Sequence, residues 1–155
     1  MAQIQIDASK SAIWPMLILG IDPGLRTTGW GVVKVAGTEL TAGACGSIRP
    51  NADLPMAERL HELFQKLHSI VTEYHPDVCA IEDIFIARNS NTTLKLGQAR
   101  GVALLASALH SVPVYEYTPT AIKKSLTGSG RAGKQQMMVM ISYLLPASQP
   151  DSDHA

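Results

Sequence analysis

The stretch MLILGIDPG, residues 16–24, places an apolar run directly before Asp22 and a Pro-Gly pair directly after it. An apolar run of this length, bounded by turn residues, predicts a buried strand, and Pro23-Gly24 predicts the turn that ends it. A carboxylate at the end of a buried strand is held rigidly, and a buried charge is costly unless it is paired or bound to a metal. The stretch therefore predicts a strand that carries a functional carboxylate at its end.

Two further acidic residues could meet Asp22 at one point. Glu82 closes a second short apolar run, VCAI at residues 78–81, and Asp153 lies in the polar segment DSDH at residues 151–154. Carboxylates gathered at one edge of a sheet suit Mg²⁺ or Mn²⁺, which prefer oxygen ligands. This arrangement favours metal-assisted phosphodiester chemistry.

The rest of the chain predicts an α/β domain. Strands are expected at 16–21, 28–35, 41–48, 78–81 and 114–117, and helices at 56–74, 92–109, 118–126 and 135–145. Asp53 and Thr118 are the expected N-caps of the first and third helices. The order of elements predicts a mixed five-stranded sheet flanked by helices, in which the first three strands form an antiparallel meander and crossovers add the others.

Composition and length indicate a single globular domain. The 155 residues are 46% hydrophobic and 17% charged, enough for one core and too few for two ordinary domains. Cys45 and Cys79 lie in strand-like segments, which favours reduced, buried thiols in a cytoplasmic protein. No apolar run reaches the length of a membrane span. We expect residues 1–15 to form a flexible leader and 16–155 to form the domain.

The net charge of +0 hides an asymmetry along the chain. Residues 84–147 contain seven lysines and arginines and one acid, Glu116. A basic half suggests a face for a polyanion, although scattered, solvated lysines are a common alternative. The basic loop at 128–134 does not match the phosphate loop of nucleotide triphosphatases, because Gln135 follows Lys134 where a Ser or Thr is required.

Several segments together resemble a known family. They are LGIDPG at 19–24, AIEDIF at 80–85, LKLGQARG at 94–101, and VYEY at 114–117 followed by a lysine-bearing helix. In this combination the chain, from about residue 16 to its end, resembles the RuvC family of Holliday-junction resolvases. The resemblance implies a ribonuclease-H-like fold and a structure-selective endonuclease of DNA recombination and repair.

The resemblance also implies a set of catalytic residues. Asp22 and Glu82 match the first catalytic aspartate and the catalytic glutamate, and Asp153 matches the first of two C-terminal acids. All three are expected to hold two Mg²⁺ ions per site, about 3.5–4 Å apart, with Mn²⁺ able to substitute. The family's second C-terminal aspartate would lie just beyond Ala155, so we expect the domain to lack its last helix. A solvated tail remains the alternative for Asp153.

Six residues are implied to contact DNA. Phe85 matches an aromatic that enters the junction and stacks on a base, although it could instead belong to the core. The implied DNA-binding set is Phe85, Arg88, Asn89, Lys95, Lys123 and Lys134. Lys134 could also stabilise charge on the scissile phosphate. Asp83 could compete with Glu82 as a ligand, but strand alternation points it to the opposite face.

The implied partners are four-way junction DNA, a second copy of the chain, and the RuvA and RuvB branch-migration proteins. Two matched incisions in a two-fold symmetric junction require two active sites, and hence a C₂ dimer. The candidate interface lies on the helix at 92–109 and comprises Leu96, Ala99, Val102, Ala103 and Ala106. The alternative is that this face packs on the sheet.

Two other functions remain open beside the junction endonuclease. Members of the actin and Hsp70 superfamily of ATPases use a similar strand–Asp–turn, but they need two such lobes and a longer chain. A junction-binding module that is catalytically inactive in this truncated form is the third reading. Metal-dependent cleavage separates the enzyme from the binding module.

Overall fold

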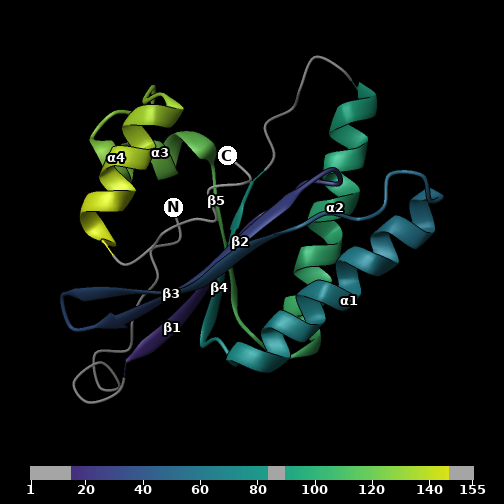
Figure 1. Cartoon of the computed structure of the whole chain (residues 1–155), viewed down its shortest axis with the longest axis horizontal. Helices are drawn as coiled ribbons and strands as arrows, with labels where there is room; N and C mark the ends of the chain where they lie inside the picture. The colour runs from purple at the N-terminus through teal and green to yellow at the C-terminus, as the bar shows by residue number, and fades with distance from the viewer. Residues whose placement is uncertain (1–14, 84–89, 147–155) are drawn as a thin grey trace.

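The computed structural model describes residues 15–83 and 90–146 (Figure 1). The strands are β1 (Met16–Asp22), β2 (Thr28–Ala36), β3 (Glu39–Ile48), β4 (Val78–Glu82) and β5 (Val114–Tyr117). The helices are α1 (Met56–Tyr74), α2 (Ser90–Leu109), α3 (Pro119–Thr127) and α4 (Lys134–Leu144). Every expected element is therefore confirmed, with boundaries that shift by at most two residues. No helix in the described ranges is long and apolar enough to cross a membrane.

The strands form one mixed sheet in the order β3-β2-β1-β4-β5. β1 pairs antiparallel with β2, and β2 with β3, which confirms the expected meander. β4 lies parallel to β1, and β5 lies parallel to β4. The register pairs Ile21 with Ile81, so the carboxyl ends of β1 and β4 lie side by side.

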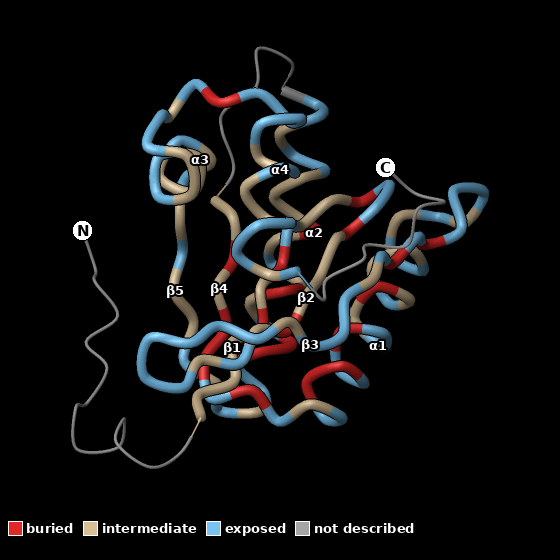
Figure 2. Tube along the Cα trace, turned by 60° about the vertical axis from the view of Figure 1, so that its left-hand side comes forward, coloured by how far each residue is buried: buried red, intermediate tan, exposed pale blue. Residues whose placement is uncertain are grey.

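Helices α1 and α2 pack together over one face of the sheet, and this layer contains the core (Figures 1 and 2). The apolar stripe of α1 buries Leu63, Leu67, Ile70 and Val71. These side chains pack against every second residue of the central strands, on the face of the sheet that α1 covers. The strand residues include Leu19, Ile21, Val32, Cys79 and Ile81. Each large apolar side chain buried in this way contributes about 1.5–3 kcal/mol. α3 and α4 lie apart from this layer, beyond β5 (Figure 1).

Three of the five residues that we expected to form a dimer interface on α2 lie in the core instead. Ala99, Ala103 and Ala106 are wholly buried and belong to the core. The helix is apolar on more than one side, and its small residues allow it to pack closely against α1 and the sheet. The outward face of α2 instead presents Leu94 and Leu105, which are 61% and 53% exposed.

Two smaller expectations also needed correction. Pro55, not Asp53, occupies the N-cap of α1, with no side-chain cap, and the Asp53 N–H donates to Asn51 Oδ1 in a turn before the helix (3.0 Å). Thr118 does cap α3, since its Oγ1 accepts from Ala121 N (3.2 Å). Cys79 is buried as expected, but Cys45 is exposed because β3 is an edge strand; both thiols are free.

Candidate active site

Asp22 and Glu82 end the neighbouring parallel strands β1 and β4. Side chains alternate along a strand, and Ile21 and Ile81 both point into the core. Asp22 and Glu82 therefore leave the sheet on the face opposite α1 and α2. Their side chains are in hydrogen-bonding contact with each other. The structure thus brings together two carboxylates that lie sixty residues apart in the sequence.

The turn that follows Asp22 is built by other residues. Thr28 is wholly buried; its Oγ1 donates to the Gly24 carbonyl (2.7 Å) and accepts from Gly24 N–H (3.1 Å). A Cβ at Gly24 would lie 2.3 Å from the Thr27 carbonyl oxygen, so only glycine fits without movement of the backbone. Gly24 and Thr28 therefore form this turn, and Asp22 is not needed to form it.

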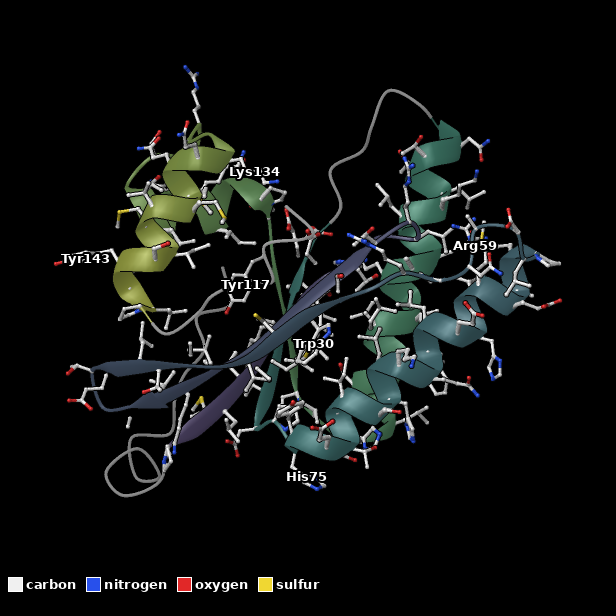
Figure 3. The ribbon with its side chains drawn as sticks, in the orientation of Figure 1. Trp30, Arg59, His75, Tyr117, Lys134 and Tyr143 are labelled. Atoms are coloured by element: carbon white, nitrogen blue, oxygen red, sulfur yellow. The ribbon has the colours of Figure 1, made fainter. Side chains whose placement is uncertain are left out.

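The carboxylate pair lies in a cleft of about 410 Å³. Its lining residues are Gly20, Ile21, Asp22, Gly29, Trp30, Ala80, Ile81, Glu82, Tyr117 and Ile122. The register pairs Asp22 with Gly29 and Glu82 with Tyr117, and Figure 3 shows Tyr117 beside the ends of these strands. Small residues on this face of the sheet leave the space that a phosphate group and cations would need.

Both carboxyl groups titrate above their ordinary range. Burial is the main cause that raises the pKa of Asp22, and a hydrogen bond from Glu82 partly offsets it. Burial also raises the pKa of Glu82, and the charge of Asp22 and their hydrogen bond raise it further. Asp22 is exposed as a residue, but its carboxyl group lines the cleft. Two crowded carboxylates of this kind favour a bound cation or a shared proton.

Lys123 on α3 is the cation that the fold brings to this pair. Its charge partly lowers the pKa of Glu82, so the ammonium group lies close enough to act on the carboxylate. Asp83 turns the other way, as alternation predicts, and forms an ion pair with Arg100 on α2 (3.3 Å). Arg100 also pairs with Glu116 on β5. Asp83 is therefore engaged on the opposite side of the sheet.

The other expected site residues are only partly placed. Phe85, Arg88, Asn89 and Asp153 lie outside the described residues. Lys134 is exposed at the start of α4, and Lys95 is exposed near the start of α2. Within residues 15–83 and 90–146, no three His, Cys, Asp or Glu side chains gather closely enough to hold a metal. The described part of the site therefore contributes the Asp22–Glu82 pair.

Sequence reasoning missed two features near the site. Tyr117 walls the cleft, and it sits beside Glu82 through the β4–β5 register, which the spacing of residues alone does not reveal. Arg59 on α1 donates from Nη2 to the Leu25 carbonyl (3.2 Å), just after the turn that follows Asp22.

Comparisons with known proteins find relatives that match most of the chain. The family of crossover junction endodeoxyribonuclease RuvC matches residues 18–155. The RuvC of Azorhizobium caulinodans is 49% identical over 138 residues, which span 89% of this chain and 82% of that protein. The RuvC of Rhodopseudomonas palustris is 47% identical over 141 residues, which span 91% of this chain and 81% of the relative.

Solved structures show the same architecture. The T. thermophilus RuvC in complex with a Holliday junction substrate superposes with a TM-score of 0.80 and 30% identity, over 86% of this chain and 82% of that one. The yeast mitochondrial Holliday junction resolvase Ydc2 superposes with a TM-score of 0.65 over 94% of this chain and 68% of that one, at 14% identity. The second similarity extends to the fold alone.

Proposed function

The chain belongs to the RuvC family of crossover junction endodeoxyribonucleases, and on that premise we propose that it resolves Holliday junctions by metal-dependent hydrolysis of DNA phosphodiesters. The observation that carries this proposal is the contact between Asp22 and Glu82 at the edge of an open cleft. Two carboxylates held together by adjacent parallel strands have no packing role that would justify their crowding.

The residues present fit a divalent cation. Burial raises the pKa of both carboxyl groups, and the charge of Asp22 raises the pKa of Glu82 further, so a bound cation would offset the cost of holding these charges close together. Carboxylate oxygens are the ligands preferred by Mg²⁺, with Mn²⁺ as a substitute. Two bound ions would activate water and stabilise charge on the attacking and leaving oxygens. We assign Asp22 and Glu82 as ligands and Asp153 as a third.

Other residues would bind and orient the DNA. Lys123 lies close enough to Glu82 to act on its charge, so it can place a positive charge beside the phosphate that enters the cleft. Lys134 would stabilise the same phosphate. Phe85 would stack on an unpaired base, worth about 1–3 kcal/mol. The other residues proposed to contact the junction are Arg88, Asn89 and Lys95.

Paired incision requires a second active site, and the outer face of α2 offers a surface for a second copy. Leu94, Leu105 and Leu109 are 61%, 53% and 60% exposed. Their spacing of eleven and four residues places them on one side of the helix. We propose that this α2 outer face (Leu94, Leu105, Leu109) forms an isologous interface in a C₂ dimer, which would supply two cleavage sites to a two-fold symmetric junction.

The same proposal extends to the cellular setting. The relatives are bacterial proteins named crossover junction endodeoxyribonuclease RuvC, and a structural neighbour was solved with a Holliday junction substrate. We propose that this chain acts on four-way junctions in the cytoplasm, in recombination and repair, and together with RuvA and RuvB.

A cleavage assay tests the proposed activity. A labelled synthetic four-way junction and a linear duplex of the same arm sequence would be incubated with the protein, with and without Mg²⁺. We expect paired nicks in opposite strands of the junction, only with Mg²⁺, and no cutting of the duplex. Tight junction binding without cleavage would favour the alternative of a junction-binding module.

A further inference from the structure

A second pocket lies beside the catalytic turn. It has a volume of about 260 Å³ and is lined by Leu25, Arg26, Arg59, Thr92, Lys95 and Leu96. These residues come from three places: the connection between β1 and β2, the first turns of α1, and the first turns of α2. Half of the lining residues are cationic. Mutual repulsion makes such a concave cluster costly unless an anion occupies it.

Arg59 links this pocket to the turn after Asp22 through a hydrogen bond, and Figure 3 shows its place on α1. Its Nη2 donates to the Leu25 carbonyl, three residues after Asp22. Its Nε is buried and has no hydrogen-bond partner among the described atoms. An unsatisfied buried donor costs about 1–3 kcal/mol. Guanidinium groups are well suited to bind phosphate oxygens, and this one retains hydrogen-bonding capacity at Nε that the described residues do not use.

The surroundings favour an anion and offer no competing carboxylate. In the described part of the chain, Arg26, Arg59 and Lys95 form no ion pair with Asp or Glu. Thr92 and Lys95 lie in the first turns of α2, where the helix dipole adds partial positive charge. Arg26 and Lys95 are exposed, so the mouth of the pocket is open to a large ligand.

We propose that this pocket, formed by Arg26, Arg59 and Lys95, binds one backbone phosphate of the DNA substrate, separate from the phosphate that is cut. The inference rests on the proposed function for the identity of the ligand as DNA. Because the pocket and Asp22 share the β1–β2 connection, a phosphate held there would fix the DNA relative to the carboxylate pair. Arg59 would act as a positioning residue in addition to binding the phosphate.

The slope of log Kd against log salt concentration tests the pocket directly. Junction binding would be measured in EDTA, so that cleavage plays no part, for the wild type, Arg26→Gln, Lys95→Gln and their double variant. Lys66→Gln, an exposed lysine on α1 that does not line the pocket, is the matched control. We expect the double variant to lower the slope by about 0.9, the value for one phosphate, and not by about 1.8 as for two independent contacts.

The double variant should bind the junction up to about eightfold more weakly than the wild type at 0.1 M salt. The affinity of Lys66→Gln should be unchanged. Arg59→Lys, which keeps the charge but removes Nε, should also weaken binding, and its melting temperature would be recorded to separate this effect from misfolding. An unchanged slope in the double variant, or an equal loss in Lys66→Gln, would overturn the proposal. A different outcome is that inorganic phosphate raises the Tm of the wild type and not that of the double variant, while the two proteins show the same salt slope for DNA. That result would assign the pocket to free phosphate and refute its role in binding DNA.

The same experiments distinguish a failure of the proposed nuclease function from a failure of the phosphate pocket. A wild-type chain that binds the junction with these slopes but never cuts it would refute the nuclease and leave the pocket standing. A wild-type chain that does not bind junction DNA would refute both.

Discussion

Replacing Asp22 with asparagine should stabilise the metal-free protein while it weakens the proposed metal site. Asp22 and Glu82 are in contact, and each has a raised pKa. At neutral pH the folded state therefore bears a repulsion between two carboxylates that the unfolded chain lacks. The substitution Asp22→Asn would keep the shape of the side chain, remove one charge, and offer an amide donor to Glu82.

The size of this effect follows from the geometry. Two unit charges about 4 Å apart repel by roughly 1 kcal/mol in water and about 4 kcal/mol at an effective dielectric constant of 20. Asp22 is exposed as a residue, so screening by solvent favours the lower end, about 1 kcal/mol. For a domain of this size, an increase of this magnitude in the free energy of unfolding corresponds to a rise in Tm of about 2–4 °C.

The dependence on pH has a defined sign. The folded-state pKa lies above the ordinary value, so the folded state holds its proton longer than the unfolded chain. Below about pH 3.9 both states are protonated and the repulsion is absent. As pH rises through the folded-state pKa, wild-type stability falls. The gain in stability of Asp22→Asn over the wild type should therefore be absent near pH 3.5 and complete at pH 8.

Thermal unfolding of both proteins in EDTA, and then in Mg²⁺, measures these effects. Mg²⁺ should raise the Tm of the wild type by mass action and raise that of Asp22→Asn far less. Asp83→Asn is the matched control, because the Asp83 carboxylate pairs with Arg100 and its loss should lower stability slightly without changing the response to Mg²⁺. The reasoning is refuted if Asp22→Asn is no more stable than the wild type at pH 8 in EDTA.

Three further substitutions test the turn, the cleft and the proposed interface. Gly24→Ala should lower the Tm by several degrees and slow cleavage, because its Cβ would lie 2.3 Å from the Thr27 carbonyl oxygen; thermal unfolding and a cleavage assay measure this. Lys123→Ala should raise the pKa of Glu82 further, since Lys123 now lowers it, and so move the acidic limb of the pH–rate profile to higher pH. Leu105→Asp should convert the proposed dimer to monomers in analytical ultracentrifugation, because it places a charge on an apolar surface.

Each of these three has a control on a neighbouring feature. Gly133→Ala, where an added Cβ meets nothing within 4 Å, should cost at most about 1 kcal/mol, the difference between glycine and alanine at a helix N-cap, and should leave the rate of cleavage unchanged. Lys124→Ala removes an exposed neighbouring charge and should leave the pH–rate profile in place. Leu40→Asp, on the edge strand β3, should leave the dimer intact. A control that behaves like its paired variant would contradict the reason given for that variant.

Much of the site could be predicted from the sequence, because its main signals are local. Asp22 and Glu82 each follow a short apolar run, and parallel neighbours end at the same edge of a sheet, so their meeting follows from pattern and topology. The α1 stripe also predicted its buried residues, Leu63 and Leu67 among them. The orientation of Asp83 followed from strand alternation alone.

The errors came where packing decides between similar local patterns. Helix α2 is apolar on several sides, so its sequence did not reveal that Ala99 and Ala103 face the core while Leu105 faces outward. Cys45 lies in an apolar segment, but its strand is at the edge of the sheet. The contact between Arg59 and the Leu25 carbonyl spans 34 residues, and no spacing rule predicts it.

The central claim is that the Asp22–Glu82 pair performs the chemistry and is not needed to bind the junction. Single-turnover cleavage of a labelled four-way junction by Asp22→Asn and Glu82→Gln in Mg²⁺, with the Kd for the same junction measured in parallel, tests it most directly. We predict that both variants lose cleavage and bind the junction at least as tightly as the wild type. Cleavage at the wild-type rate by either variant would contradict the claim.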